Sequence, residues 1–391
     1  MTIQKRFLQM VMVVICAAAG YSQRQGPPEL GSPLPGLSTE DVALFEAGKA
    51  DFLEVEGPTD GLGPAFNGRS CAECHSVPAI GGIGNQSVTR AGRMVQGRFV
   101  EPDGGSLIHK FSLPDHKCQP LVPANATVVA TRIPLAIFGD GLIEAIPDET
   151  IQALADNAER NPDGIRGRVA LVRDPASGLQ RVGRFGWKAQ QATLLGFAGD
   201  AYLFEMGITS ELFPSEAASG IAANVLAACD SVADPEDKAD PVTGRRGIDN
   251  FTNFMRLLAP PARMPGNDAA ARGEELFQLI GCAACHRPVL RTGPSATPAL
   301  DRRPVALYSD LLLHDIGTGD GIAQGAAGPN EMRTPPLWGL RLRKQLMHDG
   351  SALSVEQAIG QHGGAAARVR ERFRSLAARD QQGLLEFLGT L

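Results

Sequence analysis

Short amphipathic segments alternate along this chain with long stretches that have no regular hydrophobic period. The first such segment begins at Ser38 or Thr39, where a hydroxyl residue followed by acidic residues is typical of a helix start. Its apolar positions include Phe45 and Phe52, and it runs toward Cys71. The pattern therefore predicts a helix that delivers the chain to this cysteine.

The second half of the chain repeats the arrangement. Asn267 or Asp268 is a suitable cap for a helix that carries Leu276, Phe277 and Ile280 and leads to Gly281. Nearer the end, Ser354 and Gln357 form a capping-box pattern for a short helix that ends near Gln361. A last amphipathic helix is predicted from the apolar positions Leu384, Leu385, Phe387, Leu388 and Leu391.

Three other stretches lack this helical period. Residues 23–37 are rich in proline and glycine and are predicted to form a flexible lead. Residues 104–185 contain short β-type runs, such as 127–131, and indicate a mixed α/β, loop-rich insertion. Residues 230–265, rich in Asp, Pro and Gly, are the best candidate for a linker.

Composition narrows the class of protein. Hydrophobic residues make up 43% of the 391 positions, enough for two or three domains, but aromatic residues make up only 5%. The formal charge of −6 and the absence of a basic tract argue against a nucleic-acid partner. A mildly acidic surface of this kind is compatible with a small basic electron carrier.

The N-terminus has the pattern of an export signal. Lys5 and Arg6 precede the apolar residues 7–19, which end in Ala17-Ala18-Ala19. This run is shorter than the roughly 20 residues that a transmembrane helix needs. We interpret residues 1–19 as a cleaved signal peptide and expect a periplasmic protein without a transmembrane span. A lipid-modified Cys16 is the alternative.

Two cysteine motifs carry the strongest chemical signal. Cys71-Ala72-Glu73-Cys74-His75 and Cys282-Ala283-Ala284-Cys285-His286 both have the form C-x-x-C-H. In this pattern the two thiols attach one haem c and the histidine is the proximal iron ligand. With 7 cysteines and 7 histidines in the chain, chance gives roughly 0.002 such motifs. The sequence therefore predicts two covalently bound haem c groups.

Paired C-x-x-C motifs also occur in zinc ribbons and redox dithiols. In a zinc ribbon the second pair follows the first by roughly 15–20 residues, whereas here it follows about 200 residues later. The histidine after each pair also favours haem. The remaining cysteines of the mature chain, Cys118 and Cys229, are expected to form a disulfide in an oxidising compartment, with a catalytic dithiol as the alternative.

These elements predict a mainly α fold. We expect two haem domains of the class I cytochrome c type, the first of which carries the mixed α/β insertion. The predicted boundaries are a signal peptide at 1–19, the flexible lead at 20–37, an N-terminal haem domain with insertion and linker at 38–265, and a C-terminal cytochrome c domain at 266–391.

Several segments resemble one known family. They are RSCAECHSVPAIGG (69–82), GDGLIEAIP (139–147), GRFGWKA (183–189), YSDLLLHDIG (308–317), RTPPLWGL (333–340) and His348-Asp349-Gly350. The chain is similar in these segments to bacterial di-haem oxidoreductases often labelled thiol oxidoreductases, a branch of the di-haem cytochrome c peroxidases. The match extends in order over nearly all of the mature chain.

The resemblance implies that the C-terminal haem transfers electrons, with His286 as its proximal ligand. The peroxidases usually place a distal methionine shortly after the H-D-G segment, but the matching position here is His362. A bis-histidine pair lowers the reduction potential relative to methionine ligation. The alternative for His362 is a solvated histidine at a helix end, where the helix dipole favours it.

The resemblance further implies that the N-terminal haem, with His75 proximal, is where a small oxidant binds. Glu205 resembles the distal glutamate of the peroxidases and Trp187 their inter-haem tryptophan. Gln190 or Gln191 matches their distal glutamine, and we take Gln191 as the candidate. An exposed helix carboxylate and an ordinary core tryptophan are the alternatives for the first two residues.

Five further residues are candidates for a place around the haem groups. His314 and His348 lie in family-like segments, and the resemblance implies that they hydrogen-bond around the haem edges. His109, His116 and Met94 are possible distal ligands of the N-terminal haem, and that position can also be vacant.

The sequence thus predicts a periplasmic di-haem c-type oxidoreductase that reduces hydrogen peroxide, a cytochrome c peroxidase-like enzyme. A small periplasmic cytochrome c or cupredoxin is the expected electron donor. One alternative is a di-haem electron-transfer cytochrome without peroxidase activity. Another is an enzyme that oxidises an organic or protein substrate through high-valent iron.

Overall fold

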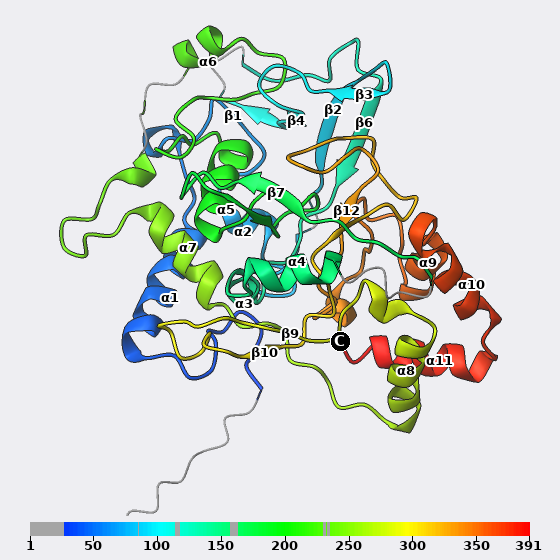
Figure 1. The fold of residues 1–391 in the computed structure, drawn as a ribbon. Coiled ribbons are helices and arrows are strands. Elements are labelled where there is room, and N and C mark those ends of the chain that lie inside the picture. Colours follow the sequence, from blue (N-terminus) through cyan, green and yellow to red (C-terminus); the bar gives the residue numbers. More distant parts are fainter. Residues whose placement is uncertain (1–26, 85, 114–117, 157–162, 230–231, 233–234) are drawn as a thin grey trace, which may run out of the picture.

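Two helical clusters joined by loops and short strands make up the molecule (Figure 1). The computed structural model describes residues 27–84, 86–113, 118–156, 163–229, 232 and 235–391. The predicted signal peptide and His116 lie outside the described residues. Within them, helices account for most of the regular structure, and the strands are short.

The first cluster is built on α1 (Thr39–Leu53) and α7 (Gly247–Leu257), which pack against each other. Ser38 caps α1 by accepting a hydrogen bond from the Asp41 amide at 3.0 Å, as the sequence predicts. The helices cross at Gly48, where an added Cβ would lie 2.0 Å from the Asn250 carbonyl oxygen. Glycine thus permits this close approach of the two backbones.

A continuous aromatic core fills the interface of this cluster. Phe52 lies 4.7 Å from Phe254 and 5.5 Å from Phe251, measured between ring centroids, and all three rings are buried. Phe45 packs on Phe254 from the other side, at 5.3 Å. Burial of such rings supplies much of the energy of a core, so α7 is an integral part of the first cluster.

The position of α7 contradicts our interpretation of residues 230–265 as a linker. Ile248, Phe251, Phe254 and Met255 recur at helical spacing and are all buried. The sequence did not predict this helix because its short apolar pattern is flanked on both sides by Asp, Pro and Gly residues, which are typical of loops.

Part of the segment expected to be a flexible lead is also held in place. The Leu34 amide donates to the Leu257 carbonyl at 2.8 Å, and the Ala259 amide donates to the Ser32 carbonyl at 3.0 Å. Leu34 is buried. Residues 32–34 therefore extend the first cluster along the end of α7.

The second cluster pairs α8 (Asp268–Leu279) with α11 (Ala378–Leu388), seen side by side at one end of the molecule in Figure 1. Asn267 caps α8 by accepting from the Ala270 amide at 2.8 Å, as predicted. A Cβ at Gly273 would lie 2.0 Å from the Gly383 carbonyl oxygen. Like the first pair, these helices cross at glycine.

Two further helices complete the second cluster. Ser354 caps α9 (Val355–Gln361) by accepting from the Gln357 amide at 3.1 Å, which confirms the predicted start. The helix ends at Gln361, as expected, and His362 is its C-cap residue. Helix α10 (Ala367–Ser375) follows and buries Val369 and Phe373.

Strands β4 to β8 lie in the region predicted as a mixed insertion, but the longest strand, β2, precedes it and four short strands follow it. One sheet has the order β3-β2-β4, with β6 also paired to β2. Its strands are β2 (Val88–Val95), β3 (Arg98–Val100), β4 (Leu107–Ile108) and β6 (Val128–Arg132). The remaining strands form antiparallel pairs: β1 (Ala65–Phe66) with β5 (Phe111–Ser112), β7 (Ala170–Arg173) with β8 (Gln180–Gly183), β9 (Leu290–Arg291) with β10 (Pro304–Val305), and β11 (Leu313–His314) with β12 (Met332–Arg333).

Short helices connect these strands to the first cluster. They are α3 (Asp140–Glu144), α4 (Asp148–Asp156), α5 (Leu194–Ala201) and α6 (Ala223–Cys229). Helix α5 packs on α7 and continues into a π-helical segment, Tyr202–Met206. Such wide turns are frequent at functional sites.

A disulfide joins Cys118 to Cys229 at the end of α6, as the sequence predicts. Cys118 is fully buried, in a small core that also contains Ala65, Ala218 and Leu226. Among the residues that the structure describes, no helix is long and apolar enough to cross a membrane.

Candidate haem centres

The first C-x-x-C-H motif forms a short helix and a turn. Ser70 caps α2 (Cys71–Cys74) by accepting from the Ala72 amide at 3.3 Å, and its own hydroxyl donates to the Phe52 carbonyl. His75 follows directly, and its Nδ1 bonds the Gly82 carbonyl at 3.1 Å. This bond fixes the ring and leaves Nε2 for another partner.

His75, Cys71 and Cys74 share one cavity. Burial raises the pKa of the Cys71 thiol well above its usual value and that of Cys74 to about 11. The potential ligand atoms of this motif do not lie close enough together to form a metal cluster among the described residues. The zinc alternative therefore has no support here.

Glu205 lines the same cavity. Asn67 Nδ2 donates to Glu205 Oε2 at 2.7 Å, while the Asn67 amide donates to the Glu205 carbonyl at 2.7 Å. Burial raises the pKa of the Glu205 carboxyl, and the bond from Asn67 offsets this effect only in part. The side chain is thus an oriented, partly buried carboxyl group that lines the cavity.

The two candidate glutamines have different places. Gln190 lines the His75 cavity, and its buried Oε1 has no hydrogen-bond partner among the described residues. Gln191 is absent from the lining, and its Nε2 donates to Asp200 Oδ1 at 3.0 Å. Asp200 does line the cavity, and burial raises its pKa to about 6. Gln191 therefore acts on the cavity through Asp200, a residue that the sequence did not single out.

The described candidates for a distal ligand of the first haem do not lie in this cavity. His109 is buried, but its Nε2 bonds the Phe204 carbonyl at 3.0 Å, and it is absent from the lining. Burial lowers its pKa to about 4. Met94 is on β2 and is partly exposed. The structure brings neither residue near His75.

The second centre has histidines on both sides. His286 Nδ1 bonds the Tyr308 carbonyl at 3.0 Å, and His362 Nδ1 bonds the Ala358 carbonyl at 2.7 Å. The two ring centroids are 6.5 Å apart, and both rings line one cavity with Cys282 and Cys285. A metal about 2 Å from each free nitrogen requires a centroid separation of about 6 Å. This geometry fits an iron bound between the two imidazoles.

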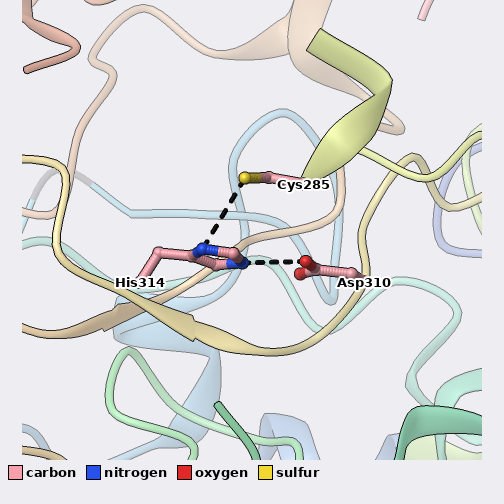
Figure 2. A group of neighbouring side chains, drawn as sticks. All are labelled: Cys285, Asp310 and His314. Carbon is pink, nitrogen blue, oxygen red and sulfur yellow. Dashed lines mark hydrogen bonds and ion pairs between the residues drawn. The ribbon is translucent and has the colours of Figure 1, made fainter. Parts of the chain in front are cut away.

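Figure 2 shows a cluster beside the second motif. His314 Nε2 bonds Asp310 Oδ2 at 2.8 Å, and His314 Nδ1 bonds Cys285 Sγ at 3.7 Å. Although burial opposes protonation, Asp310 raises the pKa of His314 to about 10. Both ring nitrogens are thus engaged at the haem edge, and His314 is not free to bind iron.

Trp187 lies between the two centres. It lines both cavities, together with residues 133–135, Arg333 and Arg343. Its Nε1 donates to the Ile133 carbonyl at 2.8 Å, and its ring meets that of His348 edge-on at a centroid distance of 6.3 Å. Trp187 is therefore one of the side chains that separate the two cavities.

Both cavities fit a haem group. Each combines two thiols and an oriented histidine with largely apolar walls, which a flat porphyrin requires. The proximal histidines also have similar surroundings, since Phe52 lies 6.4 Å from His75 and Phe277 lies 6.5 Å from His286. Buried guanidinium nitrogens without partners at the first cavity, on Arg90 and Arg132, suit an anionic group.

The comparison with protein families agrees with this description. Residues 121–391 match the family described as "Di-haem oxidoreductase, putative peroxidase". This match covers more than half of the chain, so the protein belongs to this di-haem oxidoreductase family. It is an enzyme, and the family implies two haem groups. No curated protein sequence matches the chain.

The solved structures that match this chain have low sequence identity to it. Hydrazine synthase of Kuenenia stuttgartiensis is 15% identical, with 99% of this chain and 100% of that chain covered and a TM-score of 0.43. The di-haem peroxidase BthA of Burkholderia thailandensis is 15% identical, with 93% and 87% covered and a TM-score of 0.45. A MauG-like protein associated with microbial copper homeostasis is 18% identical, with 72% and 95% covered and a TM-score of 0.33. These values are too low to indicate a substrate or a partner.

Proposed function

We propose that this di-haem oxidoreductase reduces hydrogen peroxide in the periplasm, with electrons from a small cytochrome c or cupredoxin. The observation that carries the proposal is the oriented, partly buried carboxyl group of Glu205 in the cavity of His75. Reduction consumes two electrons and two protons and releases two waters from each peroxide. The site must therefore hold and move protons where peroxide binds.

The haem groups, when bound, supply the iron that exchanges electrons and the site where a small oxidant binds. We propose that Cys71 and Cys74 hold the first through thioether bonds, with His75 as proximal ligand. Cys282, Cys285 and His286 hold the second in the same way. His362 would also hold this group and would thereby close the second centre to small molecules.

Glu205 is the group that moves a proton between the two oxygens of peroxide. Its raised pKa keeps it protonated closer to neutral pH than an exposed glutamate, so it can both release and accept a proton there. Asn67 binds one carboxyl oxygen of Glu205. This leaves the other carboxyl oxygen for the substrate. Arg90 and Asp200 line the same cavity, and both interact electrostatically with Glu205.

Trp187 is the contact through which the two centres exchange electrons. Its ring is fixed by the hydrogen bond to Ile133 and by the edge-on contact with His348. We further propose that the chain divides into haem domains at 38–265 and 266–391. The helix pairs α1–α7 and α8–α11 support this division.

Export follows from two features. The positively charged and apolar N-terminal pattern is typical of a signal peptide. The Cys118–Cys229 disulfide is stable in an oxidising compartment such as the periplasm.

The test is peroxide turnover by the Glu205→Gln variant with a reduced donor. Because general acid–base assistance contributes about 10²–10⁴-fold, turnover should fall by that order while both haem spectra stay unchanged. Glu149→Gln, an exposed carboxylate on α4, is the matched control and should keep full activity.

A second measurement separates an enzyme from an electron carrier. The half-reduced protein, with the His286 haem reduced, should bind cyanide or carbon monoxide at the His75 haem. Absence of binding, together with no peroxide-dependent oxidation of any donor, would exclude a peroxidase and leave the electron-transfer cytochrome.

A further inference from the structure

One face of the small sheet carries two arginines into the cavity of His75. In the β2–β6 pair, Val88 is opposite Arg132 and Arg90 is opposite Ala130. Residues two apart on a strand share a face, and so do directly opposed residues. Val88, Arg90 and Arg132 therefore point the same way, and all three line the cavity.

Two hydrogen bonds fix the guanidinium of Arg132. The side chain is only 4% exposed. Its Nε donates to Asp320 Oδ2 at 2.7 Å and its Nη1 to Gln324 Oε1 at 2.6 Å. Its third nitrogen, Nη2, is buried and has no hydrogen-bond partner among the described residues. A guanidinium that is fixed by two hydrogen bonds and has a third nitrogen without a partner can bind a ligand through that nitrogen.

Arg90 is arranged in a similar way. Its Nη1 donates to Ser106 Oγ at 3.0 Å, while its buried Nε has no partner within the described parts of the chain. A buried donor without an acceptor loses its hydration without replacement, which is costly, and more so for a charged group. Arg90 and Arg132 each have such a donor on the same face of the sheet. One acceptor within reach of both would satisfy them.

The nearby acids do not balance these charges. Asp320, outside the cavity lining, is shared between Arg132 and Lys188, whose Nζ lies 3.2 Å from it. Three of the described acids line the cavity, and burial raises the pKa of Asp140 to about 7, that of Asp200 to about 6 and also that of Glu205, which reduces their negative charge. Like charges near each other on one sheet face are destabilising. Positive charge is therefore in excess at this face.

We propose that Arg90 and Arg132 form a carboxylate-binding clamp inside the His75 cavity, and that it holds a side-chain carboxylate of the haem. Guanidinium groups bind carboxylates through paired hydrogen bonds, which fix orientation as well as charge. The haem carries such carboxylates and would be held in this cavity by His75 and two thiols. The inference rests on the proposed haem attachment and goes beyond it, because it assigns how the porphyrin is oriented and its charge neutralised.

The clamp also connects the two haem centres. Arg132 is held by Asp320 and Gln324, which lie on the loop of residues 318–331. Lys188, next to Trp187, donates to the Gly328 and Pro329 carbonyls of the same loop. The loop of residues 318–331 thus links the proposed carboxylate site of the first haem to Lys188. The neighbouring residue, Trp187, lines both cavities.

The test is a redox titration of the holo-protein between pH 6 and 9, with the His286 haem as internal reference. A positive charge near the first haem favours its reduced form, so Arg132→Gln and Arg90→Gln should each lower the potential of that haem. The freed carboxylate should then titrate, so the potential should depend on pH more steeply than in the wild type, where other acids of the cavity such as Asp200 already titrate. Arg132→Lys should retain most of the wild-type potential.

Arg168→Gln is the matched control. Arg168 binds Glu331 on the same loop, but it is exposed and does not line the cavity. If loosening of the loop causes the effect, Arg168→Gln will reproduce it, and the clamp is wrong. The clamp is also wrong if neither cavity arginine changes the potential or its pH dependence.

Formate distinguishes the source of the carboxylate. If the haem fills the clamp, added formate will leave the wild-type potential unchanged. A saturable shift with formate in the wild type, lost in Arg132→Gln, would show that a free anion occupies the site and would overturn the assignment to haem. Because peroxide turnover is not measured, these outcomes do not depend on whether Glu205 acts in peroxide reduction.

Discussion

His286 and His362 face each other across one cavity, with ring centroids 6.5 Å apart and each Nδ1 bonded to a backbone carbonyl. The two bonds leave both Nε2 atoms for a shared partner. His362 lies at the end of α9 and is partly buried, and its ring lines the cavity of His286. Burial lowers the pKa of His362, which favours the neutral ring that a metal requires.

The first prediction concerns this pair. His362→Met should raise the reduction potential of the C-terminal haem, because methionine ligation favours ferrous iron. Its covalent attachment should be unaffected. Potentiometry with optical detection measures the shift. A low-spin spectrum and potential that survive His362→Ala unchanged would disprove the ligand assignment.

The second prediction concerns attachment of the haem groups. Two thioether-linked haems require that the denatured protein keep its haem after acid–acetone extraction, with a mass increase of two haems by mass spectrometry. A double change of Cys282 and Cys285 to Ser should remove one of them. The C-terminal domain should also become unstable, because the porphyrin forms part of its core. A protein that carries one haem or none would contradict the proposed cofactors.

Local signals explain how much of this structure could be predicted. The helix starts at Ser38, Asn267 and Ser354 depend on neighbouring residues only, and the structure confirms all three. Helix α7 was missed because its short apolar pattern is surrounded by residues typical of loops. Its stability depends on packing against α1, a contact that joins segments about 200 residues apart.

The haem sites also combine features that the local sequence predicts with features that depend on the folded structure. The C-x-x-C-H motifs identify both centres, since the chemistry requires those residues at that spacing. By contrast, whether Gln190 or Gln191 faces the cavity depends on the direction of a single side chain after folding. Arg90 and Arg132 could be found only from the register of β2 and β6, which pairs residues about 40 positions apart. A paired-arginine signal is visible only once this register is known.

The third prediction concerns the crossing of α8 and α11. Gly273→Ala should destabilise the protein by about 1–3 kcal/mol, because the added Cβ would lie 2.0 Å from the Gly383 carbonyl oxygen. This clash outweighs the gain of about 1 kcal/mol in helix propensity. Urea denaturation followed by circular dichroism measures the change.

Gly360→Ala on α9 is the matched control for this substitution. A Cβ at Gly360 would have no heavy atom within 4 Å, so only the propensity gain remains. The control should therefore be neutral or slightly stabilising. Equal stabilities of the two variants would mean that the close helix crossing is not present in solution.

The last prediction concerns pH and stability. Glu56 is only 6% exposed, and burial, reinforced by the nearby carboxylates of Glu236 and Glu54, raises its pKa to about 8. An unfolded glutamate has a pKa of about 4.3. Between these values the folded state keeps a proton that the unfolded state has released. The contribution to stability is therefore full below about pH 4 and is lost as the pH rises toward 8.

Glu56→Gln removes this titration, so the variant should lose less stability than the wild type between pH 5 and pH 9. One pKa unit corresponds to about 1.4 kcal/mol, and the relative gain at pH 9 should be a few kcal/mol at most. Urea denaturation at both pH values measures it, with the exposed Glu149→Gln as control. If Glu56→Gln changes the unfolding free energy equally at pH 5 and pH 9, Glu56 does not hold a proton in the folded protein.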